Sequence, residues 1–383
     1  MPEVTLCSRC IYSSQITGIS FDINGVCNFC RQIDVLSLKF GTGLPAGELA
    51  WNNIVKEIKR AGRKRKYDCV IGVSGGTDSS YLLLLAKRYG LRPLAVHYDN
   101  TWNSAQAAMN IRRVTTTFDI DLWTYVVNNS EVDDIKKSFL LAGVREFDAD
   151  TDIGYVQVLR STAAKYKVSY ILEGHSFIAE GLSPAGDNYL DGGYVHDVHK
   201  RFGKLKPKTF PNLTFFRFLK WTLLFRQKFI RPLWYLSYSK EAAKEDLIST
   251  TGWKDYGGHH LENRASAFAH KIYLPQRFGI DYRFLTLAAK VRAGLLTRQD
   301  ALRAWNIPLG DDLELRKYVC ARLGISEIEL RDIMALPTRT WRDFKTYKRR
   351  FEILRPLFFV LAKKKRVPQS FYEKYCIPAK RQA

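Results

Sequence analysis

The apolar positions between residues 69 and 172 fall into short continuous runs, separated by longer stretches in which apolar residues recur every three or four positions. The runs are rich in β-branched and aromatic residues, and they predict buried strands at 70–73, 94–98, 122–127 and 169–172. The stretches between them predict helices at 80–89, 104–118, 130–142 and 153–166. Strands that alternate with helices in this way indicate an α/β fold with a doubly wound parallel sheet.

The rest of the chain divides at two changes of pattern. A glycine-rich stretch at 41–47 predicts a linker, and the amphipathic segment 48–60 after it predicts a helix. From residue 200 the chain becomes basic and aromatic, and its last part predicts helices with many Lys and Arg. We therefore expect three units, namely an N-terminal module at 1–45, the sheet domain at 46–205 and a basic, mainly helical region at 206–383.

Basic and aromatic side chains alternate closely in residues 201–235. Such a mixture could stack on the bases and contact the phosphates of a nucleic acid. It could also form an interfacial helix on an anionic membrane, which would be a peripheral contact. Helices that pack on the core and expose basic faces to solvent are the interpretation that we favour.

Composition limits the class of protein without choosing its partner. The 383 residues suffice for two or three domains, and a hydrophobic content of 46% indicates a globular protein. The formal net charge of +22 suits nucleic acid, anionic lipid, a nucleotide sugar or an acidic protein. No run is apolar enough to span a bilayer and no N-terminal signal is visible, so we expect a cytoplasmic protein.

The candidate chemistry centres on the SGGTDS loop, Ser74–Ser79, between the predicted strand 70–73 and the predicted helix 80–89. Free backbone N–H groups and the positive end of the helix dipole would face an anion there. The two glycines would let the backbone approach that anion closely, and the hydroxyl groups add donors. Asp78 is out of place in a simple phosphate cradle, and we expect it to hold a Mg²⁺ ion that bridges phosphate oxygens.

The SGGTDS loop lacks the Gly-Lys-Ser/Thr ending of a Walker P-loop, and it resembles the SGGxDS pyrophosphate loop of the ATP pyrophosphatase, or PP-loop, family. The resemblance implies that the chain splits ATP between its α and β phosphates, adenylates a carbonyl oxygen and lets a nitrogen or sulfur nucleophile displace AMP. It also implies that the loop binds ATP and that Ser74, Asp78 and Ser79 take part in catalysis. The cofactor-binding residues of the loop are then Ser74, Gly75, Gly76, Thr77, Asp78 and Ser79.

Polar residues also follow the second and fourth predicted strands. His97, Asp99 and Asn100 come at the end of the strand at 94–98. Because ligands of open parallel sheets bind beyond the carboxyl ends of the strands, these side chains either contact the nucleotide or cap the strand. Gly174 and His175 follow the fourth strand, and they resemble a second PP-loop signature whose loop closes over the ATP phosphates. That resemblance implies cofactor binding by Gly174 and a catalytic role for His175.

Two later stretches are rich in polar residues and glycine. Residues 180–194 suit Mg²⁺ ligation or the recognition of substrate hydroxyl groups, or alternatively form a surface loop. Residues 252–264 (GWKDYGGHHLENR) have histidines whose spacing matches no standard zinc pattern, so we favour anion binding or substrate orientation. The candidate substrate-binding residues are Glu180, Asp187, His259, His260, Glu262 and Arg264.

Four of the seven cysteines form two CxxC pairs, Cys7 with Cys10 and Cys27 with Cys30, in the spacing C-x2-C-x16-C-x2-C. This is the spacing of a zinc ribbon, in which four thiolates complete a closed tetrahedral Zn²⁺ site. A closed site has no open position for substrate, so we expect a structural role rather than a redox one. The remaining cysteines stand alone at Cys69, Cys320 and Cys376.

Taken together, the CxxC pairs, the SGGTDS loop, EGHSFIAEG, YLDGGY and the GW–YGGHH–E–R stretch resemble the N-acetyl sugar amidotransferases of bacterial surface-polysaccharide synthesis. The resemblance covers nearly the whole chain. It implies that ATP, Mg²⁺ and a structural Zn²⁺ serve to turn an acetamido group on a nucleotide-linked sugar into an acetamidino group. It further implies a separate glutaminase subunit with a cyclase-like barrel that channels ammonia.

A PP-loop enzyme that modifies tRNA, of the thiolation or lysidine type, is the main alternative, since it would also account for the charge of +22 and the zinc module. Against thiolation, none of the three lone cysteines forms a CxxC pair that could carry a persulfide or an iron–sulfur cluster, although they could approach one another in space. A nucleotide-binding module without catalysis is a third reading, which the intact Ser74, Asp78 and Ser79 weaken.

Overall fold

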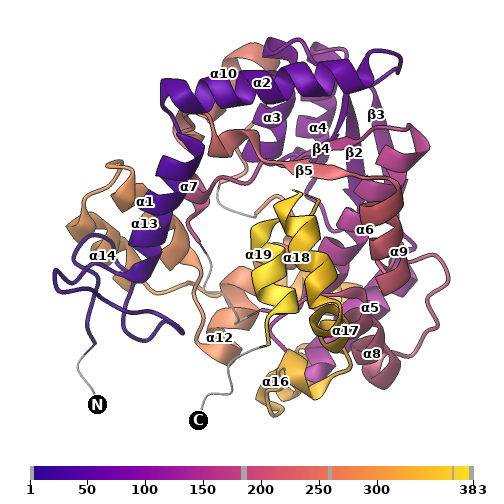
Figure 1. The fold of residues 1–383 in the computed structure, drawn as a ribbon. Helices are drawn as coiled ribbons and strands as arrows, with labels where there is room; N and C mark the ends of the chain where they lie inside the picture. Colours follow the sequence, from indigo (N-terminus) through magenta and orange to yellow (C-terminus); the bar gives the residue numbers. More distant parts are fainter. Residues whose placement is uncertain (1–3, 183–187, 258–260, 365, 379–383) are drawn as a thin grey trace.

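The centre of the protein is a parallel sheet whose five strands lie in the order β3-β2-β1-β4-β5 (Figure 1). The computed structural model describes residues 4–182, 188–257, 261–364 and 366–378. The strands are β1 (Cys69–Gly72), β2 (Pro93–Asp99), β3 (Leu122–Val126), β4 (Tyr170–Leu172) and β5 (Lys228–Ile230). The predicted doubly wound parallel sheet is confirmed, and four of its strands lie where the apolar runs placed them.

Helices cover both faces of the sheet. One core joins the sheet to α2 (Pro45–Gly62), α3 (Thr77–Arg88), α4 (Ala105–Thr117) and α10 (Lys240–Thr251). A second core joins its other face to α5 (Asn129–Ala142) and α6 (Ala149–Lys165). Cys69 and Ile71 of β1 belong to the first core and Val70 to the second, because successive strand residues point to opposite faces.

The fifth strand of the sheet lies beyond the expected domain boundary at residue 205. β5 pairs with β4 in parallel register, with Lys228 opposite Tyr170 and Ile230 opposite Leu172, and α10 packs against α3. Residues up to the end of α10 at Thr251 thus pack with the sheet, and the expected domain limits of 46–205 and 206–383 stay a prediction. The sequence concealed β5 because it is a three-residue edge strand, half-buried throughout, within a basic stretch that has no alternating pattern.

Helices also occupy two places where the sequence predicted a loop or linker, and a third place where it predicted no element. α3 begins at Thr77 with Gly76 as its N-cap, so the second half of the SGGTDS loop forms the first helical turn. α2 begins at Pro45, a position that tolerates the missing N–H of proline, and this shortens the linker expected at 41–47. α1 (Asn28–Phe40) was not predicted, and it begins directly after Cys27, whose sulfur accepts a hydrogen bond from the Cys30 N–H.

Short helices make up most of the chain after β4, as the sequence predicted for its last part. Before α10 these are α7 (Phe177–Glu180), α8 (Gly192–Phe202), α9 (Phe215–Leu219), η1 (Lys220–Leu224) and η2 (Pro232–Trp234). After α10 they are α11 (Arg264–Phe268), η3 (Ala269–Tyr273), α12 (Leu274–Phe278), α13 (Arg283–Arg292), α14 (Arg298–Asn306), α15 (Leu313–Leu323), α16 (Glu327–Ala335), η4 (Trp341–Asp343), α17 (Lys348–Ile353), α18 (Arg355–Lys363), α19 (Gln369–Phe371) and η5 (Tyr372–Cys376). Among the helices in the described ranges, none has the length and apolar character needed to cross a membrane.

The basic aromatic segment 201–235 divides between core and surface. Phe215, Phe218 and Trp221 are buried in one core with residues of α17 and α18. These three side chains follow the interpretation that we favoured, in which helices pack on the core. Phe216 and Leu224, in contrast, are 75% and 73% exposed, so part of the segment presents apolar surface to solvent.

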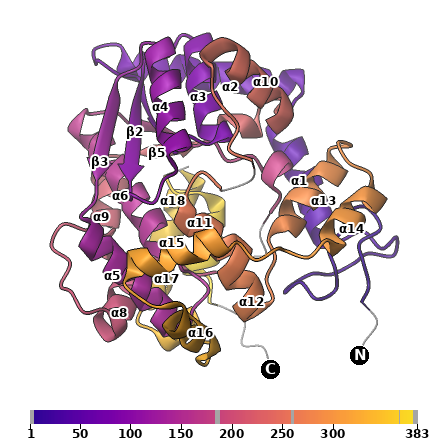
Figure 2. The ribbon, with the colours of Figure 1, turned by 180° about the vertical axis from the view of Figure 1, so that it is seen from behind.

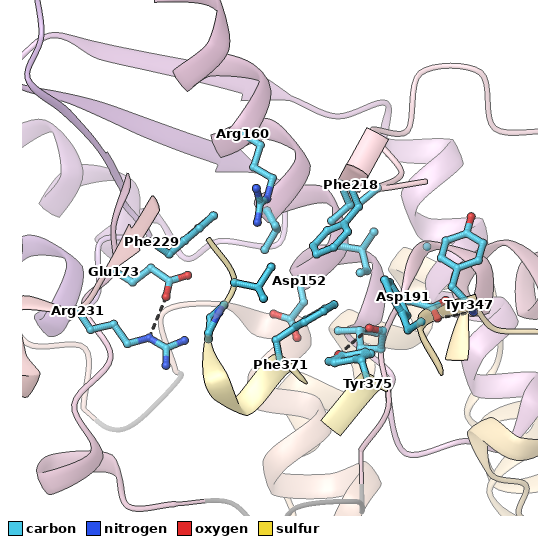
Figure 3. Close-up of a pocket in the computed structure, with 18 residues that line it drawn as sticks. Asp152, Arg160, Glu173, Asp191, Phe218, Phe229, Arg231, Tyr347, Phe371 and Tyr375 are labelled. Carbon is cyan, nitrogen blue, oxygen red and sulfur yellow. Dashed lines mark hydrogen bonds and ion pairs between the residues drawn. The ribbon is translucent and has the colours of Figure 1, made fainter. Parts of the chain in front are cut away.

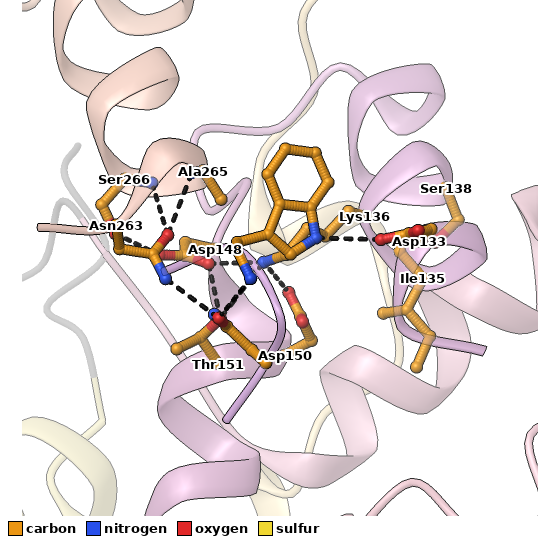
Figure 4. A network of polar contacts seen from close by, with 12 residues as sticks. Asp133, Ile135, Lys136, Ser138, Asp148, Asp150, Thr151, Asn263, Ala265 and Ser266 are labelled. Carbon is orange, nitrogen blue, oxygen red and sulfur yellow. Dashed lines mark hydrogen bonds and ion pairs between the residues drawn. The ribbon is translucent and has the colours of Figure 1, made fainter. Parts of the chain in front are cut away.

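A buried lysine joins the C-terminal region to the sheet unit (Figure 4). The Nζ atom of Lys136 on α5 lies 2.5 Å from Asp148 Oδ1 and 2.9 Å from Asp150 Oδ1. Burial acts to lower the pKa of Lys136, but the two carboxylates outweigh it and raise that pKa above its usual value. Asp148 also accepts a hydrogen bond of 2.6 Å from the Ser266 hydroxyl. The network therefore fixes α11, seen beside α15 in Figure 2, against α5 and α6.

Replacing Lys136 with methionine should lower the free energy of unfolding by about 3–5 kcal/mol, because two carboxylates would stay buried without their counter-charge. A urea titration followed by tryptophan fluorescence measures this loss. Lys56→Met, at an exposed position of α2, is the matched control and should change the free energy by less than about 0.5 kcal/mol. Equal effects of the two substitutions would show that the network does not support the fold.

Candidate functional site

The SGGTDS loop lies between the carboxyl end of β1 and the start of α3. Gly75 has a φ of +81°, and a Cβ atom there would come within 2.2 Å of the Ala107 carbonyl oxygen, so the close approach of α4 requires glycine. The Gly76 N–H donates to Ser74 Oγ at 3.2 Å, and the Ser74 N–H donates to Ser79 Oγ at 3.2 Å. The loop is thus folded around its own hydroxyl groups.

Aromatic side chains that follow α10 hold the loop from outside. The Trp253 indole N–H donates to the Gly75 carbonyl at 3.2 Å, and the Thr77 N–H donates to the Tyr256 hydroxyl at 3.3 Å. The Thr77 hydroxyl is buried and has no hydrogen-bond partner among the described residues. Buried polar atoms are normally paired, so this hydroxyl is available to a ligand in the loop.

Asp78 is surrounded by polar side chains from other elements. The Tyr238 hydroxyl donates to Asp78 Oδ1, and Lys240 Nζ lies 3.0 Å from Asp78 Oδ2 and 3.8 Å from Glu180 Oε1. Burial opposes the charge on Lys240, but Asp78 and Glu180 outweigh it and raise the pKa of the lysine. A charged ammonium group therefore lies between two carboxylates at the N-terminus of α3.

The loop after β4 closes this cluster. A Cβ atom on Gly174 would lie 3.0 Å from the Asp78 carbonyl oxygen, so the two loops are in contact. The Trp234 indole N–H donates to His175 Nδ1 at 3.2 Å, and His175 Nε2 lies 3.6 Å from Glu180 Oε2. Burial and nearby positive charge lower the pKa of His175 to about 4, so the ring is neutral at pH 7 and carries its proton on Nε2. The structure thus brings His175 and Glu180 to the SGGTDS loop.

The candidates in the stretch 252–264 separate in space. Glu262 reaches the loop, since a Cβ atom on Gly76 would lie 3.0 Å from Glu262 Oε1. The Ser104 N–H donates to the Glu262 carbonyl at 2.8 Å, which fixes this part of the chain beside the end of β2. Arg264 instead lies over the Tyr318 ring, 4.2 Å from its centre. Three candidates fall outside the described residues, namely Asp187, His259 and His260.

His97 and Asp99 have partners within the chain. His97 Nδ1 donates to the Val73 carbonyl at 2.9 Å, and the Asn103 amide donates to Nε2 at 3.3 Å. Burial lowers the pKa of His97, which favours this neutral form. Asp99 accepts a 2.8 Å hydrogen bond from the Thr101 N–H. These are the contacts of a strand cap, one of the two alternatives drawn from the sequence, and nucleotide binding by either residue stays a prediction.

Three side chains of the cluster were missed by the sequence analysis. Trp234, Tyr238 and Lys240 lie about 60 to 160 positions from His175 and Asp78 along the chain, and no motif connects them. They reach the site because β5 and the turn after it carry the chain across the carboxyl ends of the strands. A weak signal existed for Trp253 and Tyr256, which belong to the GW–YGG stretch that contributed to the family resemblance.

The arrangement suits a nucleoside triphosphate together with a divalent cation. Backbone N–H groups at the start of α3 and the Lys240 ammonium group provide positive charge for phosphates. Asp78 and Glu180 already face one cation, and carboxylates are the ligands that Mg²⁺ prefers. Such a site can bind phosphates and stabilise the charge that develops on a leaving pyrophosphate.

The N-terminal cysteines form a separate candidate metal site. All four are fully buried, and their sulfur atoms lie within 4.8 Å of one another. In a tetrahedral zinc site with Zn–S distances of about 2.3 Å, the sulfur atoms are about 3.8 Å apart, and Cys10 Sγ lies 3.9 Å from Cys27 Sγ. The donor set therefore fits a metal ion in a closed site, as expected for a zinc ribbon.

The cysteine module packs on the helix that supports α7. The Tyr12 ring contacts Phe284 of α13 at 5.1 Å between centres, and the Tyr12 hydroxyl donates to the Leu182 carbonyl at 3.3 Å. α13 in turn packs against α7, whose last residue is Glu180. The cysteine module is thus part of the support for the carboxylate that faces Lys240.

We expect about one zinc ion per chain, measured by plasma mass spectrometry on protein purified without chelators. Cys27→Ser should lower the zinc content to well below half, because it removes one of four thiolates from a closed site. Cys320→Ser, at a buried cysteine on α15, should leave the zinc content unchanged. Freshly purified wild-type protein without metal would contradict the assignment.

Comparisons with known proteins find one family model and one relative that match parts of this chain. Residues 262–357 match a family model described as LPS biosynthesis protein WbpG-like, C-terminal domain. An uncharacterized protein of Methanocaldococcus jannaschii, MJ1599, is 24% identical over 306 residues, which cover 79% of this chain and 93% of that protein.

Two solved structures are distantly similar. The NMN synthetase from Francisella tularensis has a TM-score of 0.37 at 13% identity, over 72% of this chain and 96% of its own. The U34-tRNA thiolase NcsA from Methanococcus maripaludis has a TM-score of 0.32 at 13% identity, over 71% and 90%. Residues 262–357 are therefore similar to the C-terminal domain of the WbpG-like lipopolysaccharide biosynthesis proteins.

Proposed function

We propose that this protein is an ATP-dependent amidotransferase of lipopolysaccharide or O-antigen synthesis, which converts the acetamido group of a nucleotide-linked sugar into an acetamidino group. The observation that carries the proposal is the cluster of Asp78, Lys240 and Glu180 at the SGGTDS loop. Glu262, the first residue of the WbpG-like segment, reaches the same loop. A phosphate site and a polysaccharide-synthesis segment thus meet in one place.

The chemistry follows from the weakness of an amide as an electrophile. The amide oxygen attacks the α-phosphorus of ATP, pyrophosphate leaves, and an O-adenylyl imidate forms. Ammonia then adds to the imidate carbon and AMP leaves, so that the C=O group becomes C=NH. The contribution of the protein is to position the reactants and to stabilise the developing negative charge.

The cluster has a role for each of its groups in this reaction. The N–H groups of the SGGTDS loop would bind the phosphates, while Asp78 and Glu180 would hold Mg²⁺, which neutralises phosphate charge when bound. Lys240 would stabilise the charge on pyrophosphate as it leaves. His175, with its proton on Nε2, would donate a hydrogen bond. The substrate contacts predicted for Asp187, His259, His260 and Arg264 stay part of the proposal.

Ammonia would come from another protein. The three cysteines outside the metal cluster, Cys69, Cys320 and Cys376, are buried in three different cores and so are unavailable as glutaminase nucleophiles. We therefore include a separate glutaminase subunit with a cyclase-like, ammonia-channelling subunit, acting with this protein in the cytoplasm. The net charge of +22 would favour an acidic partner or an anionic substrate.

A tRNA-modifying enzyme is the second candidate, because a charge of +22 also favours nucleic acid. Thiolation fits the structure poorly. Cys69, Cys320 and Cys376 belong to separate cores, so they cannot together carry a persulfide or an iron–sulfur cluster. A lysidine-type reaction needs no cysteine, so it is the tRNA-modifying reaction that remains compatible with the structure.

Asp78→Asn should reduce the formation of AMP from ATP at least about 100-fold, because it removes a charge that the Mg²⁺ and Lys240 contacts require. Chromatographic measurement of AMP in the presence of ammonium ions and substrate tests this. Asp119→Asn is the control, since Asp119 is exposed and has a positive φ that asparagine tolerates. Full activity of Asp78→Asn would refute the role assigned to the carboxylate.

The reaction itself can be tested by mass spectrometry. Incubation with ATP, Mg²⁺, a high concentration of ammonium ions and a panel of UDP-linked diacetamido sugars should yield AMP and a sugar in which one oxygen has become NH. The high ammonium concentration replaces the glutaminase subunit, because free ammonia can enter directly. AMP that forms only when tRNA is added would instead support the second candidate.

A further inference from the structure

A cavity of about 310 Å³ lies beside the candidate site, at the carboxyl ends of β4 and β5 (Figure 3). Its walls come from α6, the start of α8, α9, α17 and the segment of α19 and η5. Most of the lining is aromatic or aliphatic, and Phe371 stacks between Phe218 and Tyr375, with ring centres 5.0 and 4.7 Å away. The volume is at the small end for ligand pockets, which suits one sugar ring with its substituents.

The cavity contains a buried arginine with few partners. Arg160 is 5% exposed, and Figure 3 shows its guanidinium group reaching from α6 between Phe218 and Phe229. Its Nε atom is buried without a partner, and Nη1 makes a single long contact of 3.5 Å to Gln227 Oε1. No ion pair joins Arg160 to any carboxylate of the described residues.

A buried guanidinium group that forms no ion pair is costly. Burial lowers the pKa of Arg160 to about 10, and the charge of Glu173 offsets only part of this effect. The rings of Phe229 and Phe218, at 4.6 and 5.4 Å, compensate for part of the lost hydration. The flat donor edge of arginine matches the two oxygens of a carboxylate or a phosphate. The cavity therefore contains a donor group, the guanidinium of Arg160, whose hydrogen bonds an anionic ligand would complete.

The remaining polar groups of the lining suit hydroxyl groups. Glu173 and Asp152 line the cavity with carboxylate oxygens, and Glu173 is oriented by an ion pair of 3.0 Å with Arg231. The carboxylate of Asp191 already accepts hydrogen bonds from the Tyr189 hydroxyl and the Tyr194 N–H. Aromatic faces and a few fixed polar groups are the usual composition of a small-molecule site. A sugar that carries one anionic group would use all of these features together.

One wall of the cavity is shared with the candidate site. Glu173 directly precedes Gly174, which contacts the backbone of Asp78. Arg231 lies over the Trp234 ring at 5.0 Å, and Trp234 donates to His175. A ligand in the cavity would therefore lie next to the loops that hold ATP in the proposed reaction.

We propose that this cavity binds the sugar substrate, and that an anionic group of the substrate, either a carboxylate on the sugar ring or the phosphate that links the ring to its nucleotide, pairs with Arg160. This inference rests on the proposed function, since the adjacent SGGTDS loop is what makes the ligand a substrate. It adds the cavity that holds the sugar and the residue that binds its anionic group. Arg160 is a binding residue here and takes no part in the bond changes.

The test is a calorimetric titration of the full chain, without ATP, with three probes. These are N-acetylglucosamine, N-acetylglucosamine 1-phosphate and the uronic acid of N-acetylglucosamine. At least one anionic probe should bind about 10- to 100-fold more tightly than the neutral sugar, since hydrogen bonds between charged groups are strong. Preference for the uronic acid would identify a carboxylate as the anion, and preference for the 1-phosphate would identify a phosphate.

Arg160→Gln should remove this preference and leave the affinity for the neutral sugar unchanged. Arg303→Gln, on the exposed face of α14, is the matched control and should bind as the wild type. Arg160→Lys keeps the charge without the planar donor edge, and it should show an intermediate preference, which also covers the case that Arg160→Gln does not fold.

The inference fails if none of the probes binds, if the anionic and neutral sugars bind equally, or if Arg160→Gln keeps the preference. Failure of the proposed reaction would give a different set of results. Anionic sugars would then bind through Arg160, yet no sugar would lead to AMP when ATP and ammonium ions are supplied.

Discussion

The contact of Lys240 with two carboxylates is the interaction on which the candidate site depends. Asp78 lies on α3 and Glu180 on α7, and two carboxylates so placed would repel each other without a cation between them. Lys240 is the first residue of α10, a helix that packs on α3. Its position follows from the segment after β5, in which Trp234 contacts His175 and Tyr238 contacts Asp78 before α10 begins. The chain that leaves a three-residue edge strand thus brings a positive charge to the SGGTDS loop.

The sequence was sufficient for those parts of the fold that depend on local pattern. Buried strands of β-branched residues and amphipathic helices can be recognised from the sequence alone, and so can the two CxxC pairs and the SGGTDS loop. β5 could not be found in the same way, because a short, half-buried strand has no pattern of its own. Its register is set by pairing with β4, which is a tertiary interaction.

The residues of the candidate site also divide into those that the sequence identifies and those that only the folded chain brings together. Asp78, His175, Glu180 and Glu262 were singled out from motifs, and the structure places them around one loop. Lys240 and Tyr238 carry no motif, and their relation to Asp78 exists only in the folded chain. Arg160 was concealed for another reason. An arginine in a helix normally indicates a solvent-exposed face, and only the folded structure shows that this one is buried without a carboxylate partner.

The packing of the cysteine module on α13 has a consequence for the conditions in which the protein can work. Four thiolates are sensitive to oxidants, and their oxidation releases a bound metal ion. Tyr12 and α13 connect this module to α7, which ends at Glu180. Damage to the thiolates would therefore loosen a carboxylate beside the SGGTDS loop without any change in the loop itself. If the cysteines hold a metal ion, the candidate site would depend on a reducing environment and on the local supply of metal.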